Sequence, residues 1–213
     1  MLFHSAATAP IYSVMKRIAL ALALSLITAP AFAEVVPLNT LSRYLTDLGT
    51  VETTFTQINS DGTLSTGKLY IQRPGRMRFE YDPPNNALVI AGGGQLAIFD
   101  PVSDGVPTQY PLSRTPLNLI LARQVDLGRS DLVRSHSGDD TATRVLAQDP
   151  DRPEQGTIEL VFSAEPVELR QWIITDQDNG ATTVILGALE DRESLSSFLF
   201  NIPFETGKRT GNN

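Results

Sequence analysis

Two runs of alternating apolar and polar residues, joined by Arg73-Pro74-Gly75, place the strongest limit on the fold of this chain. In the second run, residues 76–82, Met77, Phe79 and Tyr81 alternate with charged residues. Successive side chains of a strand point to opposite faces of a sheet, so this spacing predicts a strand with one apolar face. The two runs are therefore expected to form a β-hairpin that is buried on one side.

The first run, residues 67–73, places a charge in line with its apolar face. Leu69 and Ile71 form that face, and the next residue in the same register is Arg73. Arg73 is thus expected to point toward the apolar side, or to extend past its rim into water. The opposite, solvent-exposed face of the hairpin is expected to carry Arg76, Arg78 and Glu80.

The same alternation recurs along most of the chain, between turns rich in Gly, Pro, Asp and Ser. Further strands are predicted at residues 51–57, 86–91, 95–100, 108–112, 132–137, 143–148, 157–163, 168–175 and 182–189. Short strands joined by hairpin turns predict an antiparallel meander, and so a mainly β, α+β fold. A sheet of this length is expected to curl into an unclosed half-barrel with a concave apolar face.

Two helices are predicted beside the sheet. Leucines at helical spacing mark residues 38–48, and Gly49 follows as a cap. A second helix is expected at residues 115–122, where Pro116 would occupy the first helical position. Because this inserted helix is apolar nearly all round, it should be covered on every side or lie over a cavity as a lid. Beyond Phe204 the sequence predicts a disordered polar tail.

The first residues have the pattern of a secretory leader. Met15-Lys16-Arg17 precedes a short apolar run and an A-x-A site ending at Ala33, so the expected start is Met15 and the expected cleavage follows Ala33. The apolar run is too short to favour the alternative of a membrane anchor. The remaining residues, 34–213, are predicted to form a single domain outside the cytoplasmic membrane.

Composition excludes several kinds of chemistry. The chain has no cysteine, so it offers no disulfide, no thiolate metal ligand and no attachment point for a lipid anchor of its own. Its two histidines, His4 and His136, give no basis for a metal site or a catalytic cluster. A net charge of −7 disfavours binding to nucleic acid or to anionic headgroups. No cofactor is indicated.

The expected concave face is the candidate ligand site. Its predicted lining comes from strands and from the inserted helix: Phe55, Leu69, Ile71, Met77, Phe79, Tyr81, Leu88, Ile90, Leu96, Ile98, Leu117, Ile120 and Leu121. Apolar faces are usually plain core, and that interpretation stays open for these residues. Arg73 in the apolar register and a helix without a polar face favour a binding cavity.

The hairpin is followed by Pro83-Pro84. Together with residues 55–57, 115–117 and 198–204, this pattern resembles the periplasmic outer-membrane lipoprotein carrier family, the LolA-like proteins. The resemblance implies a half-open barrel closed by a helical lid. It implies a soluble periplasmic carrier, expected to be a monomer. Such a carrier would receive acylated lipoproteins from an inner-membrane exporter complex and pass them to an outer-membrane acceptor. It also implies that Arg73 latches the lid when the cavity is empty.

Two other functions stay open from the residues alone. The first is a lipid-binding or lipoprotein-sensing module with the same fold. The second is a hydrolase with an unrecognised pair of carboxylates, although nothing in the sequence places two carboxyl groups together. The range of cargo, the identity of the acceptor and any role in membrane insertion cannot be read from this pattern.

Overall fold

The computed structural model of the protein describes residues 35–211 apart from 103 and 130, so the predicted leader lies outside the described residues. The strands are β1 (Thr50–Ile58), β2 (Leu64–Gln72), β3 (Arg76–Tyr81), β4 (Leu88–Gly92), β5 (Gln95–Phe99), β6 (Thr108–Pro111), β7 (Val133–Gly138), β8 (Ala142–Ala147), β9 (Thr157–Ser163), β10 (Glu168–Thr175), β11 (Ala181–Leu186) and β12 (Glu190–Asp191). The helices are α2 (Leu38–Asp47), α3 (Asn118–Leu121) and α4 (Ile202–Thr210), with short 3-10 turns η1 (Leu112–Arg114), η2 (Pro153–Gln155) and η3 (Ser197–Phe200). None of these described helices is long and apolar enough to cross a membrane.

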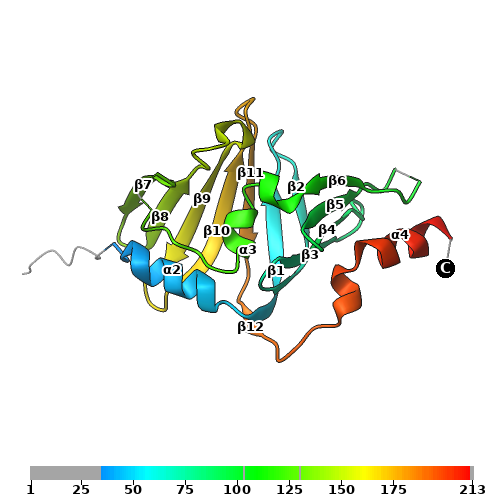
Figure 1. Ribbon diagram of the computed structural model, residues 1–213, viewed down its shortest axis with the longest axis horizontal. Coiled ribbons are helices and arrows are strands. Elements are labelled where there is room, and N and C mark those ends of the chain that lie inside the picture. The colour runs from blue at the N-terminus through cyan, green and yellow to red at the C-terminus, as the bar shows by residue number, and fades with distance from the viewer. Residues whose placement is uncertain (1–34, 103, 130, 212–213) are drawn as a thin grey trace, which may run out of the picture. The chain divides into compact units, whose positions relative to one another are not determined.

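All the strands belong to one antiparallel sheet. Their order is β6-β5-β4-β3-β2-β1-β11-β10-β9-β8-β7, and β12 pairs with the start of β1. Two meanders, β1–β6 and β7–β11, therefore meet where β1 pairs with β11 (Figure 1). Strands β6 and β7 are the two ends, so the sheet is not closed. The predicted fold class, a mainly antiparallel and unclosed sheet accompanied by helices, is confirmed.

The sheet bends so that one face is concave. Phe79 on β3 and Trp172 on β10 bring their ring centroids to 6.2 Å, although β2, β1 and β11 lie between those two strands. Four strand spacings in a flat sheet would separate the same positions by about 19 Å. We call this concave side the inner face and the opposite side the outer face.

Helices α2 and α3 lie over the inner face (Figure 1). Leu41 and Leu45 of α2 are fully buried there, as their helical spacing predicts. The hydroxyl oxygen of Tyr44 accepts a 3.0 Å hydrogen bond from the backbone N–H of Leu169, which fixes α2 to β10. Burial raises the pKa of Tyr44, so this hydroxyl stays neutral.

The end of the chain corrects the prediction of a disordered tail. Residues Ile202–Thr210 form α4, whose start is capped by Asn201 through a 2.9 Å bond from the N–H of Phe204. Pro203 lies in the first turn and Gly211 ends the helix in the left-handed conformation, with φ of 73°. These start and stop signals are present in the sequence, but the polar composition concealed them.

The C-terminal segment, residues 197–210, covers the outer face of β3–β5 and forms a second, smaller core. Ile202 packs there with Leu88, Ile90, Ala97 and Phe99. The prediction that Leu88 and Ile90 line the concave face is therefore wrong. Strand β4 is apolar on both sides because both of its faces are covered, so its alternation could not reveal which side is inner.

Candidate functional site

The inner face is lined mainly by aromatic and branched side chains from both meanders. Phe55 makes edge contacts with Phe79 and Tyr81 at centroid distances of 5.1 and 5.0 Å, and Trp172 completes the cluster from the other meander. Leu69, Ile71 and Met77 are buried beside them. These residues are brought together as the alternation predicts. Trp172 was missed, because an irregularity in the pairing of β10 between Leu169 and Gln171 breaks the alternation before it.

The register of β3, β4 and β5 identifies the remaining inner positions. Met77 is opposite Ala91 and Phe79 is opposite Val89, so Ala91 and Val89 occupy the positions that the sequence assigned to Leu88 and Ile90. The sequence assigned Leu96 and Ile98 of β5 to the inner face, and both lie on that side of the strand. Leu96 belongs to the inner core, whereas Ile98, paired with Val89, is 37% exposed near the sheet edge.

One polar contact is built into this apolar lining. The hydroxyl of Tyr81 donates a 2.7 Å hydrogen bond to Oε1 of Gln57, and burial raises the pKa of Tyr81 to about 12. The phenol therefore remains a neutral donor at any physiological pH. Such a group is compatible with an apolar ligand, because its only strong donor is already paired.

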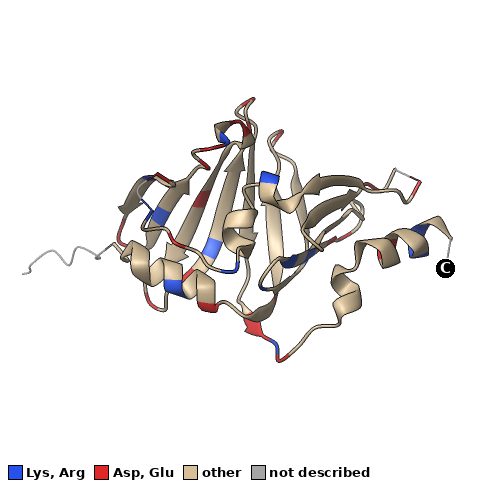
Figure 2. Ribbon diagram, in the orientation of Figure 1, with Lys and Arg blue, Asp and Glu red and all other residues tan. Residues whose placement is uncertain are grey.

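Helix α3, which the sequence predicts as a lid, rests on the inner face. Leu117, Ile120 and Leu121 are all buried in the same core as the aromatic cluster. No charged residue occurs in α3, which sets it apart from the charged turns around it (Figure 2). The observed helix, Asn118–Leu121, is shorter than the predicted 115–122, because Leu117 is its N-cap and Ala122 its C-cap.

Arg73 connects the hairpin of β2 and β3 to the end of the lid. Its Nη2 donates to the carbonyl oxygen of Ala122, directly after α3, and the N–H of Gly75 donates a 2.9 Å bond to the carbonyl of Leu121. The last carbonyls of a helix lack intrahelical partners and carry partial negative charge, so a guanidinium suits this position. We call these two bonds the latch contacts.

The latch contacts leave several polar atoms unsatisfied. Nε and Nη1 of Arg73 and Oε1 of Gln72 are buried without a hydrogen-bond partner in the described part of the chain. Burial lowers the pKa of Arg73, and the charge of Asp47 opposes that shift. Unpaired buried donors cost about 1–3 kcal/mol each, so the hydrogen bonds between Arg73 and the end of α3 are only partly satisfied.

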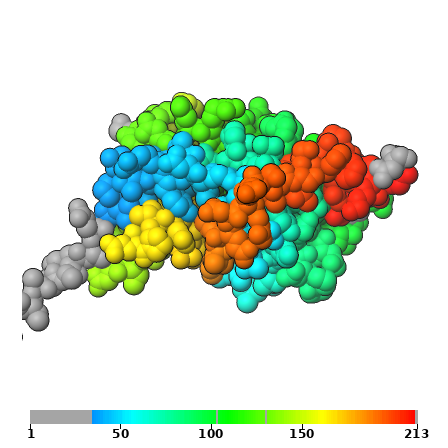
Figure 3. Space-filling view, turned by 90° about the horizontal axis from the view of Figure 1, so that it is seen from below, coloured from blue at the N-terminus to red at the C-terminus, as the bar shows by residue number. Residues whose placement is uncertain are grey.

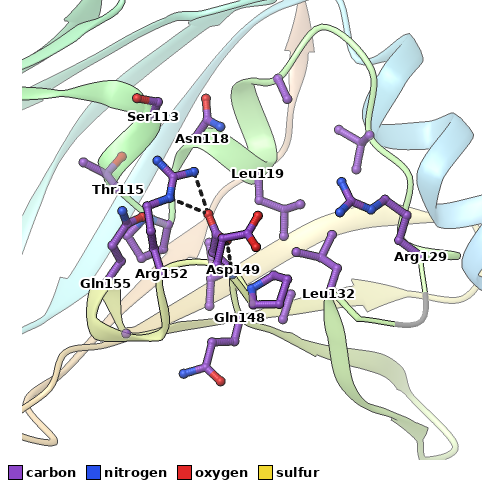
Figure 4. A pocket seen from close by; sticks show the side chains of 18 of the residues that line it. Ser113, Thr115, Asn118, Leu119, Arg129, Leu132, Gln148, Asp149, Arg152 and Gln155 are labelled. Atoms are coloured by element: carbon purple, nitrogen blue, oxygen red, sulfur yellow. Dashed lines mark hydrogen bonds and ion pairs between the residues drawn. The ribbon is translucent and has the colours of Figure 1, made fainter.

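A pocket of about 310 Å³ opens beside the lid (Figure 4). Its apolar wall includes Leu119, Leu132 and Ile158, which join it to the inner core. Its rim is polar: Arg152 binds Asp149 through Nη2 and Nε at 2.7 and 3.0 Å. The sequence did not single out this pocket, because its rim comes from loops without a recognisable motif.

The chain is similar to a known family of proteins. A family model described as outer membrane lipoprotein carrier protein LolA matches residues 46–203. An outer-membrane lipoprotein carrier protein of Coxiella burnetii is 32% identical over 112 residues, which cover 48% of this chain and 53% of that protein. The matched segment thus spans about half the length of this relative.

Two further comparisons extend over more of the chain. The outer-membrane lipoprotein carrier protein of Pseudomonas syringae pv. tomato is 26% identical over 202 residues, covering 88% of this chain and 94% of its own length. Among solved structures, a LolA superfamily protein from Nitrosomonas europaea aligns with a TM-score of 0.44 at 10% identity, over 78% of this chain and 98% of its own. Since the family model matches well over half of the residues, this chain belongs to the outer-membrane lipoprotein carrier (LolA) family.

Proposed function

We propose that this protein is a periplasmic carrier that shelters the acyl chains of lipoproteins between the inner face of its sheet and a movable lid. The observation that supports it most is the lid itself: an uncharged helix seated on an aromatic and aliphatic surface and fastened at its end by Arg73 and Gly75. Acyl chains can replace the apolar contacts of α3. They cannot replace its latch contacts.

The energetics of the task favour such a site. Each buried CH₂ group contributes about 0.8 kcal/mol, so the acyl chains of one lipoprotein would cost on the order of tens of kcal/mol if left in water. A carrier must offset much of that cost and still release its cargo. A lid that competes with the ligand for the same apolar surface lowers the apparent affinity by the fraction of molecules in which it is seated.

The proposed cycle begins with the seated lid described above. Cargo arriving from an inner-membrane exporter displaces α3, and the acyl chains occupy the surface around Phe79. At an outer-membrane acceptor the chains leave, the lid returns and Arg73 again binds the carbonyl of Ala122. The pocket at the edge of α3 offers a place where chains can enter without first removing the whole lid.

A loading assay tests this proposal directly. Purified mature protein is mixed with inner-membrane vesicles that contain a triacylated lipoprotein and the exporter, and the soluble fraction is examined for a complex. Wild type should release the lipoprotein as a soluble complex, whereas Phe79→Asp should leave it in the membrane because a carboxylate disrupts the apolar surface. Circular dichroism verifies that the variant is folded. A lipoprotein that stays in the vesicles with wild-type protein would refute the carrier function.

A further inference from the structure

A second groove, of about 730 Å³, lies on the outer face. Its floor is formed by the ends of β3–β6, and its wall is the C-terminal segment, seen in orange and red across the cyan and green strands in Figure 3. Arg76, Gln95 and Gln109 reach it from the strands, and Phe200 and Pro203 from the segment. Arg76 alternates with Met77 along β3, so this groove and the inner face lie on opposite sides of one strand.

The wall of this groove is held in place by specific contacts. Arg78 donates a 3.0 Å bond to the carbonyl of Leu199 and lies 3.5 Å from the carboxylate of Glu205. Gly92 approaches the segment so closely that a Cβ there would lie 2.1 Å from the carbonyl oxygen of Phe200. The groove is therefore preformed, which lowers the entropic cost of binding.

Arg78 also corrects a sequence prediction. It was expected to face solvent, but it is only 8% exposed and is paired with both Glu80 and Glu205. It lies on the expected outer face, which the C-terminal segment covers. Arg76 differs from it: its guanidinium lies 6.0 Å from the ring centre of Phe200 and has no ion pair among the described residues.

Three polar side chains of the groove have no hydrogen-bond partner among the described residues. The side-chain amides of Gln95 and Gln109, like the guanidinium of Arg76, make no hydrogen bond within the part of the chain that the structure describes. An unpaired cation in a largely apolar groove is complementary to a carboxylate. Each glutamine amide has both a donor and acceptors, which is the pattern needed to bind the N–H and C=O of a peptide unit.

Two exposed aromatic side chains belong to the C-terminal segment that forms the wall of the groove. Phe198 and Phe204 are 58% and 42% exposed, and their ring centroids are 4.9 Å apart. Exposed aromatic rings are typical of the residues that dominate binding at protein interfaces. A fatty acid, by contrast, has one polar end and would leave the glutamine amides unmatched.

We propose that the outer groove binds an extended peptide segment of another protein, in which an acidic side chain pairs with Arg76 and neighbouring apolar side chains contact Phe200 and the Phe198–Phe204 pair. The backbone of this peptide bonds to Gln95 and Gln109. Because the groove and the inner face are on opposite sides of β3, docking of such a partner leaves the lid free to move. The protein can thus be held by a partner while it loads or unloads.

Two matched peptide libraries test the proposal. Both are hexapeptides with capped ends and residues drawn from Ala, Ser, Leu and Phe, and they differ only in a fixed Glu or Gln at the third position. Wild-type mature protein should retain peptides of the Glu library at least tenfold more strongly. Arg76→Gln should abolish the difference and Arg76→Lys should restore part of it, since lysine keeps the charge but not the bidentate geometry.

The matched control is Arg43→Gln, at an exposed arginine of α2, which should not change retention. Should Arg76→Gln fail to fold by circular dichroism, Gln109→Leu serves as the second variant and should weaken binding of the Glu peptides. Equal retention of the two libraries, or retention insensitive to both variants, overturns the proposal. Dodecanoate that binds in an Arg76-dependent manner while no peptide does would assign the groove to a lipid, and that result also overturns it.

Discussion

Arg73 is a charged residue in the same register as the apolar residues of the inner face of β2. Strand β2 ends at Gln72, directly before it, so its side chain leaves the sheet where the lid ends rather than within the core. Its remaining donors are buried and unpaired, which limits how firmly it can hold the lid. In the proposed function, this one residue would fasten the lid and still permit it to open.

Replacing Arg73 with Leu should shift the lid toward the open state. Loss of a hydrogen bond from a charged group corresponds to about 1.5–3 kcal/mol, or roughly a tenfold to hundredfold change in the lid equilibrium. Hydrogen exchange of the amides of α3 should accelerate, and cargo transfer to a purified acceptor should slow. Arg43→Leu is the control. Exchange rates in α3 that equal those of wild type would show that the bond to Ala122 does not hold the lid.

Phe79 is the residue of the inner face whose truncation we expect to lower the free energy of unfolding most. Its ring contacts Phe55, Tyr81 and Trp172, and it is 5% exposed. Phe79→Ala should lower the free energy of unfolding by about 3–5 kcal/mol, as for other buried aromatic truncations. Phe204→Ala, at an exposed ring, should change it by less than about 1 kcal/mol. Urea unfolding measures both, and similar losses would contradict the assignment of Phe79 to the core.

At the scale of elements, the C-terminal segment is attached by charge as well as by apolar contact. Glu205 is 5% exposed and lies between Arg78 and Arg209, while Arg209 also covers the ring of Phe99 at 5.1 Å. A buried charge is stable only when it is paired, so the docking of α4 depends on the ionised form of Glu205.

This dependence predicts a specific effect of pH. Burial alone would raise the pKa of Glu205, but the bond from Arg209 and the charges of Arg78 and Arg209 outweigh it and lower the pKa below its usual 4.5. The stabilisation is thus complete above pH 4.5 and is lost as the pH falls through the lowered value. Urea midpoints should fall over that range in wild type, and this part of the fall should be absent in Glu205→Gln. An identical pH dependence in both proteins would exclude Glu205 as the titrating group.

The elements also show how far sequence reasoning can reach. Strand β3 was predicted with its inner side, because Met77 and Phe79 alternate with charged residues and belong to the inner core. The inner side of strand β4 could not be predicted, since Leu88 and Ile90 are buried on one face and Ala91 on the other. The covering helix α4 was missed because charge composition was given more weight than the Asn201 cap and the final Gly211. The pocket beside the lid depends on loops whose positions no local pattern encodes.

At the scale of the whole molecule, the net negative charge governs how the protein interacts with a membrane surface. The chain carries a net charge of −7, and removal of the predicted leader, which contains Lys16 and Arg17, would make it more acidic still. Anionic membrane surfaces repel such a protein. A protein with this charge is not expected to adhere to anionic lipid.

The mature protein should therefore stay in the supernatant when it is sedimented with vesicles of phosphatidylglycerol. Vesicles of neutral phosphatidylcholine provide the control. Lower salt lengthens the range of repulsion, so any weak association should decrease further as salt is removed. Binding to the anionic vesicles that strengthens at low salt would mean that a local basic surface overrides the net charge.

The position of β1 also has a consequence for the order in which the chain folds. One side of β1 pairs with the adjacent β2, but its partners on the other side, β11 and β12, begin only at Ala181 and Glu190. Until those distant strands have paired, the first six strands can form a sheet whose β1 border has free backbone groups, which invite pairing with other chains. A folding intermediate of this kind is thus prone to aggregation until β11 pairs with β1, and chaperone binding in that interval would protect it.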